Sequence, residues 1–160
     1  MQSMKEHKAF MMRAIELARA GMTRGEGGPF GAVVVRDGEI IGEGWNRVLV
    51  LNDPTAHGEV QAIRDACSRL GSFSLEGCEI YTTGQPCPMC LGAILWARIG
   101  RIHHGFRVED AARIGFDDRE FFREFALPVE RRKVGSVDCC REEALKLVDE
   151  YAALPTTRGY

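Results

Sequence analysis

Two short stretches of this chain place metal-binding side chains where helices are expected to begin. The first is DPTAHGEV, which contains His57 and Glu59, and the second is QPCPMC, which contains Cys87 and Cys90. A strand, CEIYTT at 78–83, is predicted between them. In parallel α/β layers, consecutive helices begin at the same edge of the sheet. The pattern therefore favours a fold that brings the two helix starts together.

The two cysteines and the histidine form a candidate metal site. Cys87 and Cys90 lie three positions apart, on one face of the first helical turn, where Pro86 and Pro88 are well suited because no backbone N–H donor is needed there. The positive end of the helix dipole favours the thiolate, the form of cysteine that binds metal. With His57 they make three protein ligands and leave a fourth tetrahedral position open, as in catalytic zinc sites. We predict one Zn²⁺ per subunit.

Glu59 follows His57 by two positions, and such side chains point away from each other in the middle of a helix. At the N-terminal mouth of a helix, both can point toward the space ahead of its axis. We therefore predict that Glu59 is catalytic and transfers protons between a metal-activated water and the substrate. A lone Cys-x-x-Cys is commonly a redox pair or buried packing, and a lone His-x-Glu is weaker still. It is the combination that indicates catalytic zinc.

The rest of the chain alternates strands with helices. Residues 4–20 repeat apolar positions at helical spacing, with Gly21 expected to end that helix, and GAVVVRDGEIIGEGWN predicts a β-hairpin with its turn at Asp37-Gly38. Further helices are expected at about 54–70, 86–98, 109–126 (interrupted at 115–118) and 139–153, and further strands at 101–106 and 129–137. This order predicts a three-layer α/β/α fold around a central mixed five-stranded sheet.

Length and composition narrow the class of protein. The 160 residues are expected to form one domain, and 45% hydrophobic with 28% charged residues is typical of a globular protein. The start lacks the apolar segment of a signal peptide, and LGAILWARIG is too short to cross a bilayer. We expect a cytoplasmic protein without a membrane partner, whose six cysteines are free, buried or metal-bound. A net charge of −2, with one short basic run at 130–133, makes nucleic acid an unfavoured partner.

His-x-Glu followed by Pro-Cys-x-x-Cys is the signature of zinc-dependent nucleobase deaminases. The chain resembles that family, with the cytidine-deaminase-like fold, over nearly its whole length. Within the family it is most similar to the small bacterial guanine deaminases, through GGPFGAV, NDPTAH, CPMCLGAILWAR, GFDD and the closing tyrosine. The resemblance implies hydrolysis of guanine at C2 to xanthine and ammonia. It also implies that Glu59 protonates a ring nitrogen and then the departing amine.

The resemblance further implies a pocket for a small nucleobase. Phe30 and Trp96 match aromatic positions that line the pocket, and Asn46 matches a polar residue that hydrogen-bonds the base. Without the resemblance, the two aromatic residues would be equally well explained as core residues, and Asn46 as a residue that shapes its loop.

Three more positions follow from the resemblance. Asp118 matches an acidic residue that recognises the purine edge, with Asp117 as the adjacent alternative, and Tyr160 matches a terminal aromatic that closes the pocket. The aspartates would otherwise be helix caps and the tyrosine a frayed end. In guanine deaminases of this type the C-terminal segment, about 127–160 here, is exchanged between two subunits. The resemblance thus implies a homodimer in which Asp118 and Tyr160 serve the neighbouring site.

Two departures from the family pattern bear on the substrate. Gly58 stands where guanine deaminases usually have alanine, and Gln85 stands where many relatives have glutamate. The alternatives are therefore deamination of cytosine, guanosine or another amino-heterocycle such as a triazine, and deamination of adenosine in tRNA, which would need a basic groove. A non-catalytic zinc-stabilised module is the alternative outside enzymes, and it would have no use for Glu59.

Overall fold

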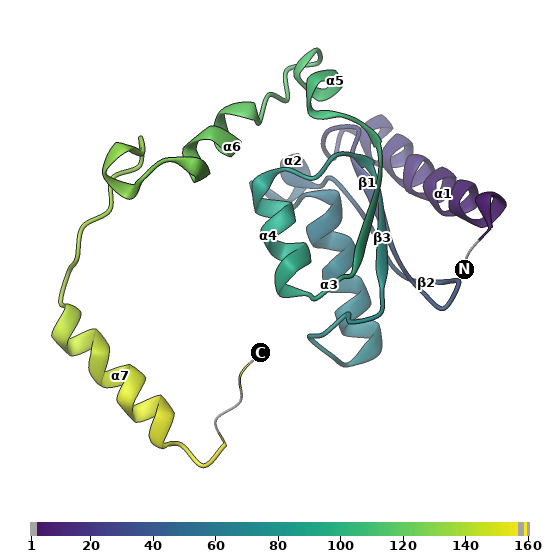
Figure 1. Cartoon of the computed structure of the whole chain (residues 1–160). Coiled ribbons are helices and arrows are strands. Elements are labelled where there is room, and N and C mark those ends of the chain that lie inside the picture. The colour runs from purple at the N-terminus through teal and green to yellow at the C-terminus, as the bar shows by residue number, and fades with distance from the viewer. Residues whose placement is uncertain (1–2, 157–158, 160) are drawn as a thin grey trace. The chain divides into compact units, whose positions relative to one another are not determined.

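The computed structural model describes residues 3–156 and residue 159 (Figure 1). Two compact units make up the chain, Met1–Phe122 and Arg123–Tyr160. Tyr160, which is expected to close a pocket, lies outside the described residues. None of the helices in the described part of the chain is long and apolar enough to cross a bilayer.

The first unit contains a four-stranded mixed sheet with the strand order β2-β1-β3-β4. The strands are β1 (Gly31–Arg36), β2 (Glu39–Trp45), β3 (Glu79–Gly84) and β4 (Arg101–Phe106). β1 pairs antiparallel with both β2 and β3, whereas β3 and β4 are parallel. β2 and β3 therefore run in the same direction and end at the same edge of the sheet. The mixed sheet is confirmed.

The turn between β1 and β2 confirms the predicted hairpin. Asp37 and Gly38 have φ angles of 51° and 82°. Positive φ at both central residues defines a type I′ turn, whose twist matches that of the flanking strands. Asp-Gly suits this turn because aspartate tolerates the left-handed region and glycine has no Cβ to oppose it.

Helices cover both faces of the sheet (Figure 1). One core lies between the sheet and two helices, α3 (Gly58–Leu70) and α4 (Pro88–Trp96), and includes Ala32, Val34, Ala62, Ala66, Ile80 and Ile94. The other lies between the sheet and α1 (Met4–Thr23), and includes Phe10, Ala14, Leu17, Val33, Val35 and Tyr81. Successive residues of a strand point to opposite faces, so β1 contributes to both cores.

The first helix is longer than its sequence suggests. Ser3 caps it: the Ser3 hydroxyl accepts the Glu6 N–H, and the Glu6 carboxylate accepts the Ser3 N–H at 2.7 Å. The predicted end at Gly21 was wrong, because the helix continues to Thr23. A side chain at Gly21 would collide with the Trp45 ring, so this glycine serves close packing and does not terminate the helix.

Helices α3 and α4 begin later than predicted. The Asp53 carboxylate accepts both the N–H and the hydroxyl of Thr55, which forms a turn before α3. Helix α3 therefore starts at Gly58 with His57 as its N-cap, and the short helix α2 (Val48–Leu51) precedes this turn. Similarly, α4 starts at Pro88 with Cys87 as its N-cap. Both shifts place two of the three candidate metal ligands, His57 and Cys87, at helix N-caps.

Helix α3 packs very closely on β2. A Cβ at Gly42 would lie 2.6 Å from the carbonyl oxygen of Ala62, and a Cβ at Gly44 would collide with the Ala62 amide nitrogen and the Gly58 carbonyl oxygen. Only glycine at these two strand positions allows the helix backbone to approach so closely. The two glycines thus fix the depth at which α3, and the residues at its start, sit on the sheet.

After β4 the chain forms two short helices, α5 (Val108–Ala112) and α6 (Arg119–Ala126). The break between them confirms the interruption predicted at 115–118. Gly115 has a φ of 93°, a conformation that other residues rarely adopt.

The second unit contains a 3₁₀ turn, η1 (Val129–Arg131), and helix α7 (Arg141–Ala153). The strand predicted at 129–137 was wrong, and with it the five-stranded sheet. The Lys133 N–H is bonded to the Glu124 carboxylate at 2.8 Å. Val134 and Val137 are 82% and 90% exposed, so the apolar residues of this segment bury no strand face.

We expect Gly44→Ala to lower the free energy of unfolding by about 1 to 3 kcal/mol, because the new methyl group must push α3 away from β2. Gly100→Ala is the matched control, since its nearest neighbour would be 3.8 Å away. Its effect should stay within about 0.5 kcal/mol. Urea denaturation of both variants measures the difference, and equal stability would contradict the close-packing argument.

Candidate active site

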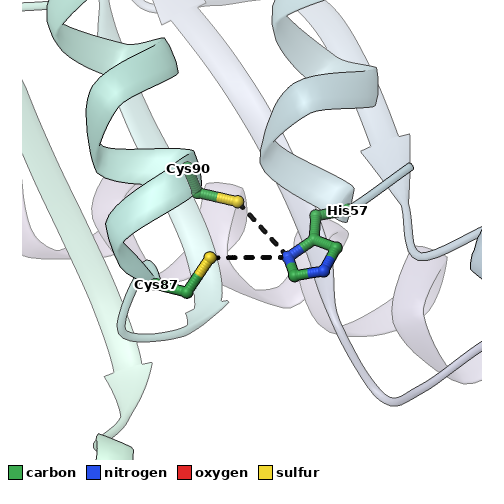
Figure 2. A group of neighbouring side chains, drawn as sticks. All are labelled: His57, Cys87 and Cys90. Atoms are coloured by element: carbon green, nitrogen blue, oxygen red, sulfur yellow. Dashed lines mark hydrogen bonds between the residues drawn. The ribbon is translucent and has the colours of Figure 1, made fainter. Parts of the chain in front are cut away.

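Two helix starts converge at the edge of the sheet where β2 and β3 end. His57, the N-cap of α3, and Cys87, the N-cap of α4, both have extended backbone conformations. Cys90 lies in the first turn of α4 and is fully buried. Figure 2 shows that the two sulfur atoms point toward the imidazole ring of His57. The structure therefore brings together the three predicted metal ligands.

The spacing of these atoms fits zinc. The Nδ1 atom of His57 lies 3.6 Å from Cys87 Sγ and 3.5 Å from Cys90 Sγ (Figure 2). The three ligand atoms lie within 4.8 Å of one another. Tetrahedral coordination with Zn–S near 2.3 Å and Zn–N near 2.05 Å places sulfur and nitrogen about 3.6 Å apart. The triad thus matches a zinc ion bound through Nδ1 and two sulfurs.

Hydrogen bonds among the three groups prepare a thiolate. The hydrogen bonds that Cys87 forms with Cys90 and His57 lower the pKa of the Cys87 thiol to about 4. The same contact with Cys87, together with burial, raises the pKa of Cys90, and the Cys87 hydrogen bond raises the pKa of His57. Cys87 therefore carries a negative charge at neutral pH, which attracts a cation to this point.

Glu59, the second residue of α3, is only 6% exposed. Burial raises the pKa of its carboxyl group. Its side chain lines the same cavity as His57 and Cys87. A carboxyl group with a raised pKa is more readily protonated than an ordinary carboxylate, which suits a general acid–base catalyst.

The cavity next to the triad has a volume of about 420 Å³. Small-molecule sites typically fall between about 300 and 1,000 Å³. All its lining residues belong to the first unit, namely Gly27, Gly28, Phe30, Asn46, Val48, Leu49, Pro54, His57, Glu59, Gln85, Cys87, Val108, Ala111, Gly115, Phe116, Asp117, Asp118 and Phe121. The wall is thus mainly apolar, with a few polar groups near the triad.

Aromatic rings form one wall of the cavity. Phe30 packs edge-to-face against Phe116, with ring centroids 5.0 Å apart, and against Phe106 at 5.7 Å. A Cβ at Gly28 would lie 2.8 Å from the Phe116 ring, so glycine makes room for this wall. Phe116 was not predicted from the sequence as a pocket residue, although it directly precedes Asp117 in the GFDD marker.

Asn46 is buried at the end of β2 and lines the cavity. Its side-chain oxygen accepts the Val48 N–H at 3.2 Å. A Cβ at Gly27 would collide with that oxygen, so Gly27 leaves the space that Asn46 occupies. This arrangement commits the oxygen to the backbone and leaves the amide NH₂ group as the available donor.

The two aspartates of GFDD differ in their contacts. Asp117 forms a two-point ion pair with Arg119, at 2.7 and 2.5 Å. By contrast, Asp118 Oδ1 is buried and has no hydrogen-bond partner within the described residues. Burial also raises the pKa of the Asp118 carboxyl group. A buried acceptor without a donor is costly, so Asp118 is the aspartate that a ligand N–H would satisfy.

Trp96 is not among the residues that line the cavity. It ends α4 and is 66% exposed, whereas the resemblance implied a position in the pocket. The two departures from the family pattern both lie near the site. Gln85 lines the cavity, and a Cβ at Gly58 would lie 3.0 Å from the carbonyl oxygen of Phe30, a tight contact.

Residues 4–106 match the family described as the cytidine and deoxycytidylate deaminase zinc-binding region. The match covers more than half of the chain and contains His57, Glu59, Cys87 and Cys90. The protein therefore belongs to this family of zinc-binding deaminases, which confirms the resemblance found in the sequence.

Guanine deaminase from Bacillus subtilis (strain 168) is 52% identical over 128 residues, which cover 80% of this chain and 82% of that protein. An X-ray structure of Bacillus subtilis guanine deaminase superimposes with a TM-score of 0.92 at 45% identity, covering 96% of this chain and 98% of that one. The tRNA-specific adenosine deaminase of Aquifex aeolicus (strain VF5) is 45% identical over 93 residues, which cover 58% of this chain and 61% of that protein. The likeness to guanine deaminase thus extends over more of the chain.

Replacing Cys90 with alanine should remove zinc, because two ligands cannot hold it. We expect the zinc bound at this triad to fall from about one equivalent per chain to below about one tenth. Cys139→Ala is the matched control, since Cys139 is exposed and lies in the second unit. Metal analysis after gel filtration measures both. Full zinc content in the Cys90 variant would remove this residue from the ligand set.

Proposed function

We propose that this protein is a zinc-dependent guanine deaminase that converts guanine and water to xanthine and ammonia. The observation that carries the proposal is that the buried carboxyl group of Glu59 lines the same cavity as His57 and Cys87. These two residues, with Cys90, place their ligand atoms at the distances that zinc coordination requires. The similarity to Bacillus subtilis guanine deaminase, over about four fifths of both chains, supports guanine as the substrate.

One zinc ion per subunit would be held by His57 Nδ1, Cys87 Sγ and Cys90 Sγ. Bound zinc supplies the Lewis acidity that activates a water molecule for attack at C2 of guanine. The position of the three ligands at helix N-termini supports this role, because the helix dipoles favour the thiolate form of the cysteines. The remaining functions belong to residues of the chain itself.

Glu59 moves the protons of the reaction. Its carboxylate takes one proton from the attacking water and delivers it to a ring nitrogen, and it later moves the second proton of that water from the new C2 hydroxyl to the amino group on C2. The C2–N bond then breaks and ammonia leaves, while the new C2–O bond remains in xanthine. Burial supports this role because it raises the pKa of Glu59, so that the group can hold and release a proton.

Three residues of the cavity would bind the base. Phe30, supported by Phe116, offers an apolar surface for the purine ring. The NH₂ group of Asn46 would donate to an acceptor of guanine, which has O6 and N7 on one edge. Asp118 would accept a purine N–H through its unsatisfied Oδ1 atom, within the described part of the chain. Asp117, which is engaged by Arg119, is the weaker candidate.

We further propose a homodimer of single deaminase domains in which segment 127–160 is exchanged between subunits. In the described part of the second unit, α7 buries none of its residues, and its apolar side chains Leu147 and Val148 are exposed. Exposed Leu95 and Trp96 on α4 offer a second apolar surface. Tyr160 would then act at the partner's site, whereas Asp118, which the resemblance also assigned to the neighbouring site, lines the cavity of its own chain. A solution mass of one chain, by light scattering, would exclude this assembly.

The cytoplasm is the compartment that we propose for this reaction. All six cysteines are free, including the buried Cys78 and the adjacent exposed pair Cys139 and Cys140. Free thiols of this number suit a reducing compartment.

The proposed function predicts that Glu59→Gln loses at least about 100-fold in kcat while it retains zinc, because glutamine cannot transfer a proton. Xanthine formation and metal content should be measured together. Glu39→Gln is a matched control on the exposed start of β2 and should keep full activity. Unchanged turnover in the Glu59 variant would remove this residue from the mechanism.

The same assay decides the substrate. Ammonia release should be followed with guanine, cytosine, guanosine, a triazine and tRNA, each with zinc-loaded protein. We expect turnover with guanine. Consumption of cytosine or of tRNA adenosine, with guanine untouched, would overturn the proposed substrate but not the zinc site.

Asp118→Asn should lower kcat/KM for guanine by about 10- to 100-fold, because a charged acceptor is replaced by a neutral one that also carries a donor. Zinc content should not change. Asp117→Asn, the neighbouring control, should have a smaller effect, since its carboxylate already binds Arg119. A larger loss at Asp117 than at Asp118 would reverse the assignment of the two aspartates.

A further inference from the structure

A second cluster of metal-ligating side chains lies on the other face of the sheet. It consists of His7 from α1, Glu79 from β3 and His103 from β4. One ligand atom from each residue lies within 4.8 Å of the others. None of these three residues lines the catalytic cavity. We call them the α1-side cluster.

Strand periodicity explains two members of the α1-side cluster. Tyr81 is the register partner of His103 in the parallel pair β3–β4, and their rings stack with centroids 4.3 Å apart and an interplanar angle of 7°. Glu79 precedes Tyr81 by two positions, so it points to the same face. The three side chains are therefore neighbours on the face that α1 covers.

Helix periodicity brings in the third member. Phe10 packs against the Tyr81 ring with centroids 5.1 Å apart. His7 lies three positions before Phe10, on the same side of α1. The helix thus places His7 against the strand residues. The centroid of the His7 ring lies 4.9 Å from that of His103.

Short polar contacts already join these groups. His103 Nε2 lies 2.6 Å from Glu79 Oε2, and His7 Nδ1 lies 2.6 Å from the Tyr81 hydroxyl. The Tyr81 hydroxyl is also 3.3 Å from Glu79 Oε2. The side chains of His103 and Glu79 are 25% and 28% exposed, so an ion can enter from solvent and water can complete its coordination.

We propose that His7, Glu79 and His103 form a second binding site, for a divalent late first-row transition-metal ion such as zinc. Two imidazoles and one carboxylate are a donor set known from three-ligand zinc sites. Imidazole suits zinc, copper and nickel, and a carboxylate adds the charge that stabilises a cation. On binding, the ion replaces the protons that the side chains now share.

A metal at this site would cross-link three elements of the first unit. It would join α1 to β3 and to the edge strand β4. Glu79 is the first residue of β3, whereas Cys87 follows the end of the same strand. The two sites are therefore at opposite ends of β3 and on opposite faces, so the second ion stabilises the fold and takes no part in the catalytic cavity.

The alternative is a hydrogen-bonded cluster that binds no metal, and the number of bound ions separates the two. The full-length protein, loaded with zinc, should be equilibrated with micromolar free zinc and its metal content measured. We expect about two equivalents for the natural sequence. His7→Gln and His103→Gln should each keep the first equivalent and reduce the second to below about one tenth.

His104→Gln is the matched control because His104 is the next residue on β4, points to the opposite face and pairs with Thr82. It should retain both equivalents. Glu79→Gln provides a second test should a histidine variant fold poorly, and the first equivalent of zinc together with guanine turnover reports folding of every variant. Cobalt spectra distinguish the sites, since only the site with cysteines gives thiolate charge-transfer bands.

The thermal midpoint gives an independent measure. Excess zinc should raise the midpoint of the natural sequence and of His104→Gln, and it should raise that of His103→Gln less, because binding to the folded state alone stabilises it. One equivalent in the natural sequence, or a second equivalent that survives substitution of both His7 and His103, would overturn the proposal. Neither result would touch the proposed deaminase activity.

Discussion

The active site depends on the direction in which two strands run. β2 and β3 flank β1 and both pair with it antiparallel, so they end at the same edge of the sheet. The helices that follow them therefore start side by side, with His57 and Cys87 as their N-caps. Were either strand reversed, the histidine and the cysteines would lie at opposite edges. Strand direction thus decides whether the three candidate metal ligands can meet.

Close packing of α3 on β2 then fixes the positions of the site residues on α3. Gly42 and Gly44 let α3 approach β2 so closely that a single methyl group would not fit. This close approach also fixes the positions of His57 and Glu59, which lie at the start of α3. The imidazole then reaches the two sulfur atoms at 3.5 and 3.6 Å, while the carboxyl group stays buried beside the cavity. A backbone contact between a strand and a helix therefore controls the positions of both the candidate metal ligands and Glu59, the proposed proton-transfer group.

The predictions from sequence succeeded where local signals were strong. The Asp37-Gly38 turn and the break between α5 and α6 were predicted because each depends on a few neighbouring residues. The convergence of His57 with two cysteines was predicted from the order of strands and helices, since consecutive helices of α/β layers begin at the same edge of the sheet. The strand predicted at 129–137 was wrong, because valine favours strands although Val134 and Val137 here face solvent. Helix starts shifted because side-chain turns such as that of Asp53 with Thr55 compete with helical bonds.

The sequence by itself determined the chemical groups of the candidate metal site and their placement at two helix starts, since ligand spacing and capping are local properties. Only the tertiary structure decided which aspartate has an unsatisfied oxygen, that Phe116 supports Phe30, and that Trp96 lies outside the cavity of its own chain. It also decided that His7 meets residues of β3 and β4. These outcomes depend on packing between residues far apart in the chain, and no local pattern encodes such distances.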